Sequence, residues 1–284
     1  MSARDLSELR NEVDRLDDAM LDLLIERMAV VQHIASLKGD RDLGRLALRP
    51  AREAMILRRL TARARGRFPA ASLLQMWREL LGATTSAQAP LRICVWEPEG
   101  RGAIRDLARN HFGTLAPVRS AETAEEALRS LGDGSAQIAV LPLPEEADRW
   151  WRSLLGDGSR PLHVVSRLPF LDGSGHSHPQ AFAVAALDPE PSGEDLSLLV
   201  FETAPDISCA RLCEALHAAG LAPRPLATLH DGAESSVLHL IELNGFLTPG
   251  EAPLAACLEP LGRRILRVTP IGGYPRPLSE AELG

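Results

Sequence analysis

The sequence predicts a multidomain protein in which an all-helical domain is followed by an α/β lobe and then by an α+β domain of the ferredoxin-like type. Three observations lead to this fold class. Apolar stripes of helical period fill the first part, strands and helices alternate from residue 91 onward, and a linker divides that second region near residue 190. The expected domains are 1–90, 91–190 and 191–284.

Three helices account for the first domain. The longest is expected over residues 3–38, with Ser2 as its N-cap and Gly39 as its stop. At roughly 1.5 Å per residue it spans about 54 Å, which exceeds what a small globular core needs, so it is expected to pack along another chain. The second and third helices are expected over 50–65, starting with a proline, and 69–87.

Cations interrupt the apolar stripe of the first helix. The stripe is formed by Leu6, Leu9, Val13, Leu16, Met20, Leu23, Val31 and Ile34. Arg27 and Lys38 occupy two further positions on it, and no acidic residue accompanies them there. Either both side chains extend along the helix to solvent, or this part of the stripe lines a cavity that binds an anion. Lys38 is also the only lysine among 31 basic residues.

The third helix repeats the pattern of an apolar stripe that ends in polar groups. Leu73, Trp77 and Leu80 continue into Thr84 and Gln88 at helical spacing. Exposure at a frayed helix end is one interpretation of these two polar residues. The other is that they face the same cavity as the cations of the first helix.

Composition narrows the setting and the partners. Residues 1–88 carry 15 Lys and Arg against 12 Asp and Glu, although the whole chain has a net charge of −7, so an anionic partner is expected at the front. The arginine-rich run at 52–67 lacks interleaved aromatics, which argues against nucleic acid. The four cysteines form no CxxC pair, and no signal peptide or membrane-spanning run is seen, so a reduced, cytoplasmic location is expected.

Residues 4–88 resemble the all-helical chorismate mutase family. The resemblance rests on "LR" ending in Arg10, "ERM" with Arg27, "SLK" with Lys38, "RPAREA" with Arg52 and Glu53, and "ELLGATTSAQ" with Thr84 and Gln88. It implies the pericyclic rearrangement of chorismate to prephenate, in phenylalanine and tyrosine biosynthesis. That reaction requires no metal and no cofactor, only a fixed substrate conformer and donors at the ether oxygen.

The resemblance also implies a role for each of these residues. Lys38 and Gln88 would stabilise the ether oxygen, Arg10 and Arg27 would bind carboxylates, Arg52 would orient the substrate, Glu53 would accept from the ring hydroxyl, and Thr84 would bind where the family often has Ser. Arg49 stands where the family often has an acid, so hydroxyl recognition would depend on Glu53.

Helix geometry predicts a homodimer with shared active sites. Arg10 and Arg27 are separated by about 26 Å along one helix, too far for one small ligand, whereas Arg27 and Lys38 are about 16 Å apart and nearly in phase. Antiparallel pairing of two first helices would bring Arg10 of one chain near Arg27 of the other. The family has such intertwined dimers.

The rear half resembles an altered prephenate dehydratase lobe followed by an ACT regulatory domain. "WEPEGRGAIRDLARNHFG" and "GSAQIAVLPLP" resemble the dehydratase, but Gln180, Ala181 and Phe182 replace its Thr-Arg-Phe motif, and one of two lobes is missing. The ACT turn reads Ala-Arg-Leu at 210–212 in place of the Gly-Ala-Leu of the family, which departs from the pattern that binds phenylalanine. We therefore expect a regulatory or structural rear half. A working bifunctional mutase–dehydratase and a non-catalytic regulator that binds chorismate-like anions are the alternatives.

Overall fold

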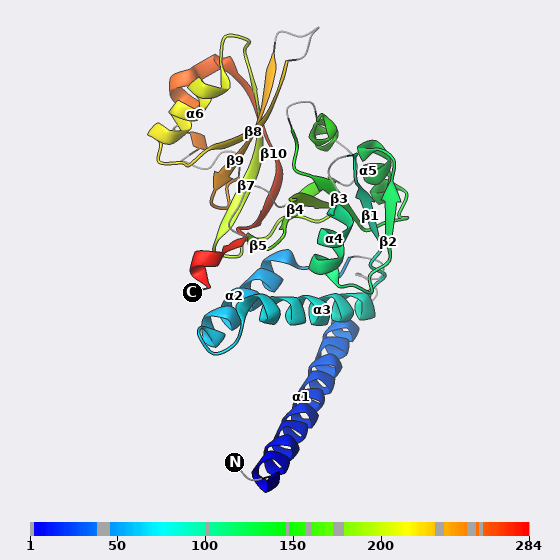
Figure 1. Cartoon of the computed structure of the whole chain (residues 1–284). Coiled ribbons are helices and arrows are strands. Elements are labelled where there is room, and N and C mark those ends of the chain that lie inside the picture. The colour runs from blue at the N-terminus through cyan, green and yellow to red at the C-terminus, as the bar shows by residue number, and fades with distance from the viewer. Residues whose placement is uncertain are drawn as a thin grey trace.

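The computed structural model describes most of the chain. The described residues are 3–38, 46–99, 103–145, 148–156, 161–172, 179–230, 236–248, 254–255 and 258–283. Three helices come first, and a large sheet with its covering helices follows (Figure 1). Across the described residues, no helix is both long enough and apolar enough to cross a membrane.

The three predicted front helices are present within one residue of their expected limits. They are α1 (Ala3–Lys38), α2 (Pro50–Ala64) and α3 (Ala70–Gln88). Pro50 starts α2 because its fixed φ suits the first helical turn and its missing N–H would be unpaired there in any case. The predicted helix limits are therefore confirmed.

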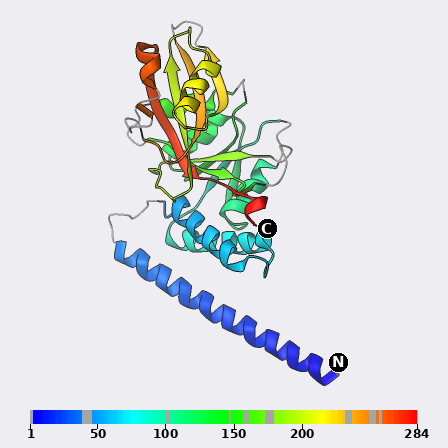
Figure 2. The ribbon, with the colours of Figure 1, turned by 90° about the vertical axis from the view of Figure 1, so that its left-hand side faces the viewer.

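Helix α1 projects from the rest of the molecule and meets α3 near its own C-terminal end (Figures 1 and 2). Four of its residues, Arg27, Met28, Val31 and Ala35, are partly buried. Its N-terminal two thirds are exposed, including the large apolar residues Leu6, Leu9, Val13, Leu16, Met20 and Leu23. Within a single chain, most of the apolar stripe therefore contacts solvent.

Nine strands form one continuous sheet in the order β2-β1-β3-β6-β4-β10-β7-β9-β8. Their bounds are β1 Ile93–Trp96, β2 Val118–Ala121, β3 Ile138–Pro142, β4 His163–Leu168, β6 Ala181–Ala185, β7 Asp195–Thr203, β8 Arg224–His230, β9 Val237–Asn244 and β10 Ile265–Pro275. A separate pair is formed by β5 (Leu171–Asp172) and β11 (Leu278–Ser279). The remaining helices are α4 Ile104–Phe112, α5 Ala124–Gly132 and α6 Cys209–Ala218, with 3₁₀-helices η2 Trp150–Leu155, η3 Glu259–Arg264 and η4 Glu280–Glu282.

The first part of this sheet is an α/β layer, as predicted. Strand β1 pairs in parallel with β2 and β3, and β6 joins antiparallel to β3 and β4. Helix α4 packs on one face, where Leu48 and Leu91 join the core, and α5 and η2 pack on the other. Because both faces are covered, these strands are almost continuously apolar.

The last third has the strand order of a ferredoxin-like sheet. Strands β10, β7, β9 and β8 are adjacent in that order, and every pair is antiparallel. A ferredoxin-like domain has a second helix before its last strand; here that segment, 251–264, lies partly outside the described residues and ends in η3. Strand β10 also pairs with β4 through Gly272 and Val164, so the sheet runs across the expected boundary at residue 190.

The helical hairpin of α2 and α3 shares its core with the rear half. Ala54, Leu57, Leu74 and Leu81 pack with Phe170, and Leu278 belongs to the same cluster. The apolar stripes of residues 1–90 suggest a front domain with a core of its own. In the structure, however, residues that follow β4 complete the buried face of the hairpin. The rear half therefore stabilises the hairpin.

Candidate active site

Arg10 lies far from the other predicted site residues of its own chain. It is exposed on the projecting part of α1. Seventeen residues separate it from Arg27, which is about 26 Å along a helix axis. A single chain does not bring Arg10 to α3.

Arg27 is a half-buried cation on the part of α1 that contacts α3. Its Nη1 atom is buried and has no hydrogen-bond partner among the described residues. Burial lowers the pKa of its guanidinium, because desolvation disfavours the charged form. A buried donor without a partner is costly, and an anion in contact with Arg27 would remove that cost. Lys38 is the last residue of α1, and its side chain lies outside the described part.

Thr84 and Gln88 lie in the last turns of α3 and hydrogen-bond to their own helix. The Thr84 hydroxyl is buried and donates to the carbonyl oxygens of Leu80 and Leu81, at 3.0 and 2.9 Å. The Gln88 Nε2 atom donates to the Thr84 carbonyl oxygen at 3.0 Å.

Glu53 forms a buried ion pair instead of facing solvent. Its Oε2 atom accepts a hydrogen bond from Arg78 Nη1 at 2.9 Å, and both side chains are less than a tenth exposed. Burial raises the pKa of Glu53, and the charge of Arg78 opposes that rise. Arg52, the preceding residue on α2, is exposed and lies about 100° further round the helix.

Arg78 is not among the residues predicted from the sequence, because the buried stripe of α3 lies one residue after the expected one. The buried residues include Leu74, Arg78, Leu81 and Thr85, whereas Leu73, Trp77 and Leu80 are only partly buried. The error follows from the rear half, which covers α3 from a direction that helical period alone does not indicate. An arginine three and four residues from buried leucines was the available signal.

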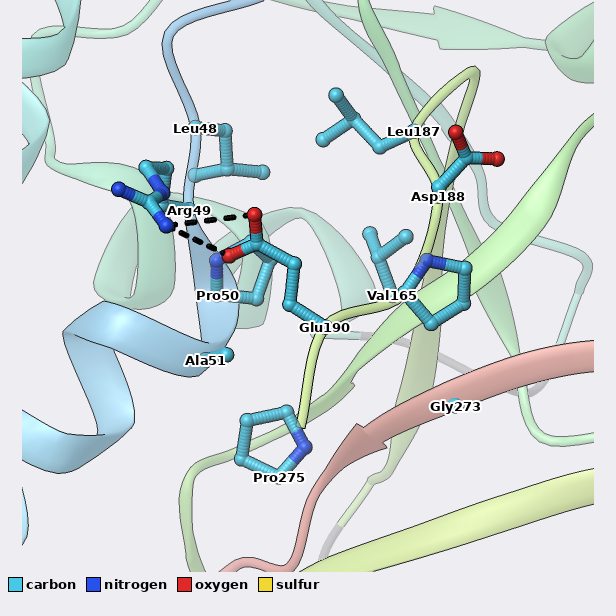
Figure 3. Close-up of a pocket in the computed structure, with 11 residues that line it drawn as sticks. Leu48, Arg49, Pro50, Ala51, Val165, Leu187, Asp188, Glu190, Gly273 and Pro275 are labelled. Carbon is cyan, nitrogen blue, oxygen red and sulfur yellow. Dashed lines mark hydrogen bonds and ion pairs between the residues drawn. The ribbon is translucent and has the colours of Figure 1, made fainter. Parts of the chain in front are cut away.

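Arg49 contributes to a different feature, a cavity of about 60 Å³ between the start of α2 and the rear half. Figure 3 shows its guanidinium directed at the carboxylate of Glu190, at 3.0 Å, beside Pro50. The remaining walls are mostly apolar and come from Leu48, Ala51, Val165, Leu187, Pro189, Gly273 and Pro275, with Asp188 at the edge. Arg49 therefore pairs with the rear half in this chain.

The described residues contain no group of three His, Cys, Asp or Glu side chains placed to bind a metal ion. The histidines of the "GHSHP" segment lie outside the described part of the chain. The structure thus describes Arg27 on α1 with a buried, unpaired Nη1 atom, Thr84 and Gln88 bonded to their own helix α3, and Glu53 of α2 in an ion pair with Arg78.

These features define a helical domain whose polar groups suit a small, negatively charged ligand. Residues 9–89 match the family model described as chorismate mutase type II, so the chain carries a chorismate mutase type II domain at its front. The three-helix architecture agrees with that match.

Curated relatives extend the similarity beyond the front domain. The chain is 26% identical over 149 residues to a bifunctional chorismate mutase/prephenate dehydratase of Stutzerimonas stutzeri, covering 51% of this chain and 40% of the relative. It is 28% identical over 139 residues to the enzyme of the same name from Neisseria gonorrhoeae, covering 49% and 37%. The chain thus matches about two fifths of the length of these relatives.

A comparison of structures finds a prephenate dehydratase from Streptococcus mutans. It is 16% identical, with a TM-score of 0.40, and the alignment covers 65% of this chain and 97% of that chain.

Proposed function

We propose that this protein is a chorismate mutase that rearranges chorismate to prephenate in aromatic amino-acid biosynthesis. The observation that carries the proposal is Arg27, whose buried Nη1 atom has no partner among the described residues and lies on the part of α1 that contacts α3. The family match over residues 9–89 supports chorismate as the anion that such a group would bind.

The proposed mechanism uses fixed charges and donors. The reaction is pericyclic, so the protein has to hold a compact conformer and stabilise the negative charge that develops on the ether oxygen. Arg27 and Arg10 would bind the two carboxylates through charge-assisted hydrogen bonds. Lys38 and Gln88 would donate to the ether oxygen, and Gln88 would exchange its contact with the Thr84 carbonyl for the substrate.

Three further residues would complete the proposed site. Arg52 would orient the substrate from the exposed side of α2, and Glu53 would accept from the ring hydroxyl. Thr84 would turn its hydroxyl from the α3 backbone toward the ligand. These roles follow from the family resemblance.

We infer that the site forms between two chains. The apolar stripe of α1 is exposed from Leu6 to Leu23, which is the character of a helix that pairs with a partner. In an antiparallel pair around a two-fold axis, Arg10 of one chain would reach the Arg27 and Lys38 of the other. Each dimer would then contain two such sites.

An assay of chorismate consumption tests the proposed activity. Purified full-length protein, treated exhaustively with a chelator, is expected to convert chorismate to prephenate. Lys38→Ala is expected to lower kcat by roughly 10²-fold, as for the loss of one preorganised donor. Arg15→Ala is the matched control, because Arg15 is an exposed cation on the same helix and pairs with the neighbouring Glu12.

Two results would contradict the proposal. One is a wild-type rate no greater than the uncatalysed rate, and the other is activity that returns only with added metal. Binding of chorismate without turnover would favour the non-catalytic regulator instead.

We further propose that the rear half is an altered dehydratase-like lobe and an ACT-like domain without dehydratase activity. Gln180 occupies the place of the catalytic motif in the resemblance, and it accepts from Arg167 and donates to Asp172, at 2.9 and 3.1 Å. Both ends of its amide are therefore bound to neighbouring side chains. The alternative, a bifunctional enzyme, is favoured by the names of the curated relatives.

Product analysis with prephenate separates these two alternatives. We expect no phenylpyruvate from the purified chain at neutral pH beyond the enzyme-free control, because Gln180 and Ala181 replace Thr and Arg. Formation of phenylpyruvate above that control would show that the protein is a bifunctional mutase–dehydratase.

A further inference from the structure

The ion pair between Glu53 and Arg78 joins two of the front helices in a dry environment. Arg78 on α3 donates from Nη1 to Glu53 Oε2 on α2 at 2.9 Å, and the two residues are 6% and 8% exposed. Isolated burial of either charge would be costly, so each depends on the other. The pair therefore determines where the Glu53 carboxylate lies.

A residue from the rear half covers this pair. Phe170 lies between β4 and β5 and is 7% exposed. The Cζ atom of Arg78 is 5.0 Å from the centre of its ring, a distance at which a guanidinium is attracted to the face of an aromatic ring. The carbonyl oxygen of Phe170 accepts from the Leu278 N–H at 2.7 Å, which ties the C-terminal segment to the same place.

A second arginine holds α2 against the rear half at the same ring. The Cζ atom of Arg58 is 5.9 Å from the centre of Phe170. Its guanidinium donates to the Ser192 hydroxyl and to the carbonyl oxygens of Glu194 and Arg276, at 3.0, 2.7 and 2.9 Å. Helix α2, which carries Glu53, is thus attached to the linker and to the end of β10.

We propose that Arg78 is a positioning residue of the mutase site, which together with Phe170 of the rear half keeps the Glu53 carboxylate charged and oriented for the substrate hydroxyl. This inference rests on the proposed function, because the role of Glu53 belongs to it. In this inference the rear half contributes to the mutase reaction, because its residue Phe170 shields the buried ion pair from solvent.

The surrounding charges explain why Arg78 is needed. Burial alone raises the pKa of Glu53, and Arg78 is the group that opposes the rise. The other titratable or charged groups near the pair are His111 on α4 and Arg167 on β4, which line a small cavity with Arg78, and Arg58 on α2. Burial keeps the pKa of His111 well below its usual range, so it adds no charge at neutral pH.

The chemistry of the pair sets the expected results. Without Arg78, burial would raise the pKa of Glu53 further and favour its protonated form, which is a weaker acceptor for the substrate hydroxyl. Loss of a hydrogen bond to a charged group corresponds to roughly 10- to 100-fold in kcat/KM. Lysine can restore the charge at this position but lacks the planar fork that stacks on Phe170.

The experiment uses the full chain and compares four variants. They are Arg78→Met, Arg78→Lys, the double variant Glu53→Gln with Arg78→Met, and the control Arg59→Met, an exposed arginine on α2. The double variant removes both buried charges, so it is expected to fold even if Arg78→Met alone does not. Two measurements are made: kcat and KM for chorismate from pH 6 to 9, and the titration of the Glu53 side-chain carbon by ¹³C NMR, assigned by its loss in the double variant.

We expect Arg78→Met to lose roughly 10- to 100-fold in kcat/KM at pH 7, mainly through KM, and to recover as the pH rises. Its Glu53 signal should titrate at a higher pH than in the wild type. Arg78→Lys should recover part of the activity, Arg59→Met should match the wild type, and the double variant should be no more active than Arg78→Met and should not recover at high pH.

An unchanged pH profile and an unchanged Glu53 titration in Arg78→Met would overturn the inference while leaving an active wild type as support for the proposed function. If Arg78→Met does not fold, the double variant is measured in its place. A rise of its kcat/KM at high pH would then overturn the inference. An inactive wild type would defeat the proposed function and the inference with it.

Discussion

Two arginines of this protein lie on helix faces that are otherwise apolar, and both bear on helix packing and on the proposed chemistry. Arg27 and Arg78 each occupy a position where helical period calls for an apolar residue, and each is partly or fully buried. Arg78 is matched by Glu53, whereas Arg27 keeps a buried Nη1 atom without a partner among the described residues. The first arrangement holds helices together, and the second leaves a donor for a ligand.

His111 provides a residue-scale prediction about pH. It is 7% exposed, and its ring lies edge-on to Phe112. Burial, helped by the charge of Arg78, holds the pKa of His111 well below the usual value of 6.5. The unfolded chain therefore binds a proton that the folded chain excludes, so the free energy of unfolding should fall as the pH drops below about 6.5.

Chemical denaturation at several pH values tests this. The variant His111→Phe should lose part of the decrease between pH 6.5 and 5, because phenylalanine has no proton to gain. His217→Asn, which changes an exposed histidine on α6, serves as the control and should keep the wild-type slope. Equal slopes in His111→Phe and the wild type would contradict the burial of a neutral imidazole.

Single residues show how far the sequence could predict the site. Arg27 and Lys38 were found because a charge on an apolar stripe is visible in one helix. The pairing of Glu53 with Arg78 was not, because it joins residues 25 positions apart and depends on a ring from residue 170. The hydrogen bonds of Thr84 and Gln88 to their own helix could not be predicted either, since rotamers are not encoded by spacing.

At the scale of elements, the front helices were predictable because their ends carry local signals. A proline starts α2, and alternating apolar spacing runs through all three helices. The face that each helix buries was less predictable. The face of α3 that packs against α4 and Phe170 is displaced by one residue from the stripe that the sequence predicts.

The close approach of α3 and α4 gives an element-scale prediction. A Cβ atom added at Gly82 would lie 2.1 Å from the carbonyl oxygen of Phe112, which is backbone at the end of α4. Gly82→Ala should therefore push the two helices apart and lower the free energy of unfolding by about 1–3 kcal/mol. Thermal and chemical unfolding of the full chain measure this.

Gly132→Ala is the matched control for that change. It also lies in a helix, α5, and a Cβ atom there would meet nothing within 4 Å. It should leave stability unchanged or slightly raised, because alanine favours helix more than glycine does. A Gly82→Ala protein as stable as the control would show that α3 and α4 are further apart than described.

In the whole molecule, one sheet joins the two rear domains, 91–190 and 191–284, that the sequence predicts to be separate. The order of strands within the last third follows from their βαββαβ sequence, which was predictable. The insertion of β10 between β4 and β7 was not, because it depends on contact between Gly272 and Val164, more than 100 residues apart. The apolar pattern along the chain predicts the individual strands, but it does not predict which strands of two distant segments pair with each other.

The exposed first helix is the other whole-molecule feature, and it leads to the central claim that two chains build each mutase site. Most of the apolar stripe of α1 is exposed among the residues that the structure describes, and Arg10 is remote from Arg27. An antiparallel pair of α1 helices would cover the stripe and supply the missing cation at once. Mixing two inactive variants distinguishes this arrangement from a site within one chain.

The decisive measurement is therefore the mutase activity of refolded mixtures of Arg10→Ala and Lys38→Ala proteins. Each homodimer should be nearly inactive. With random assortment, half the dimers are mixed, and each mixed dimer has one intact site and one doubly damaged site, so activity should return to roughly a quarter of wild type. If mixed dimers are shown to form and activity stays at the level of the separate variants, the site lies within one chain and the claim is wrong.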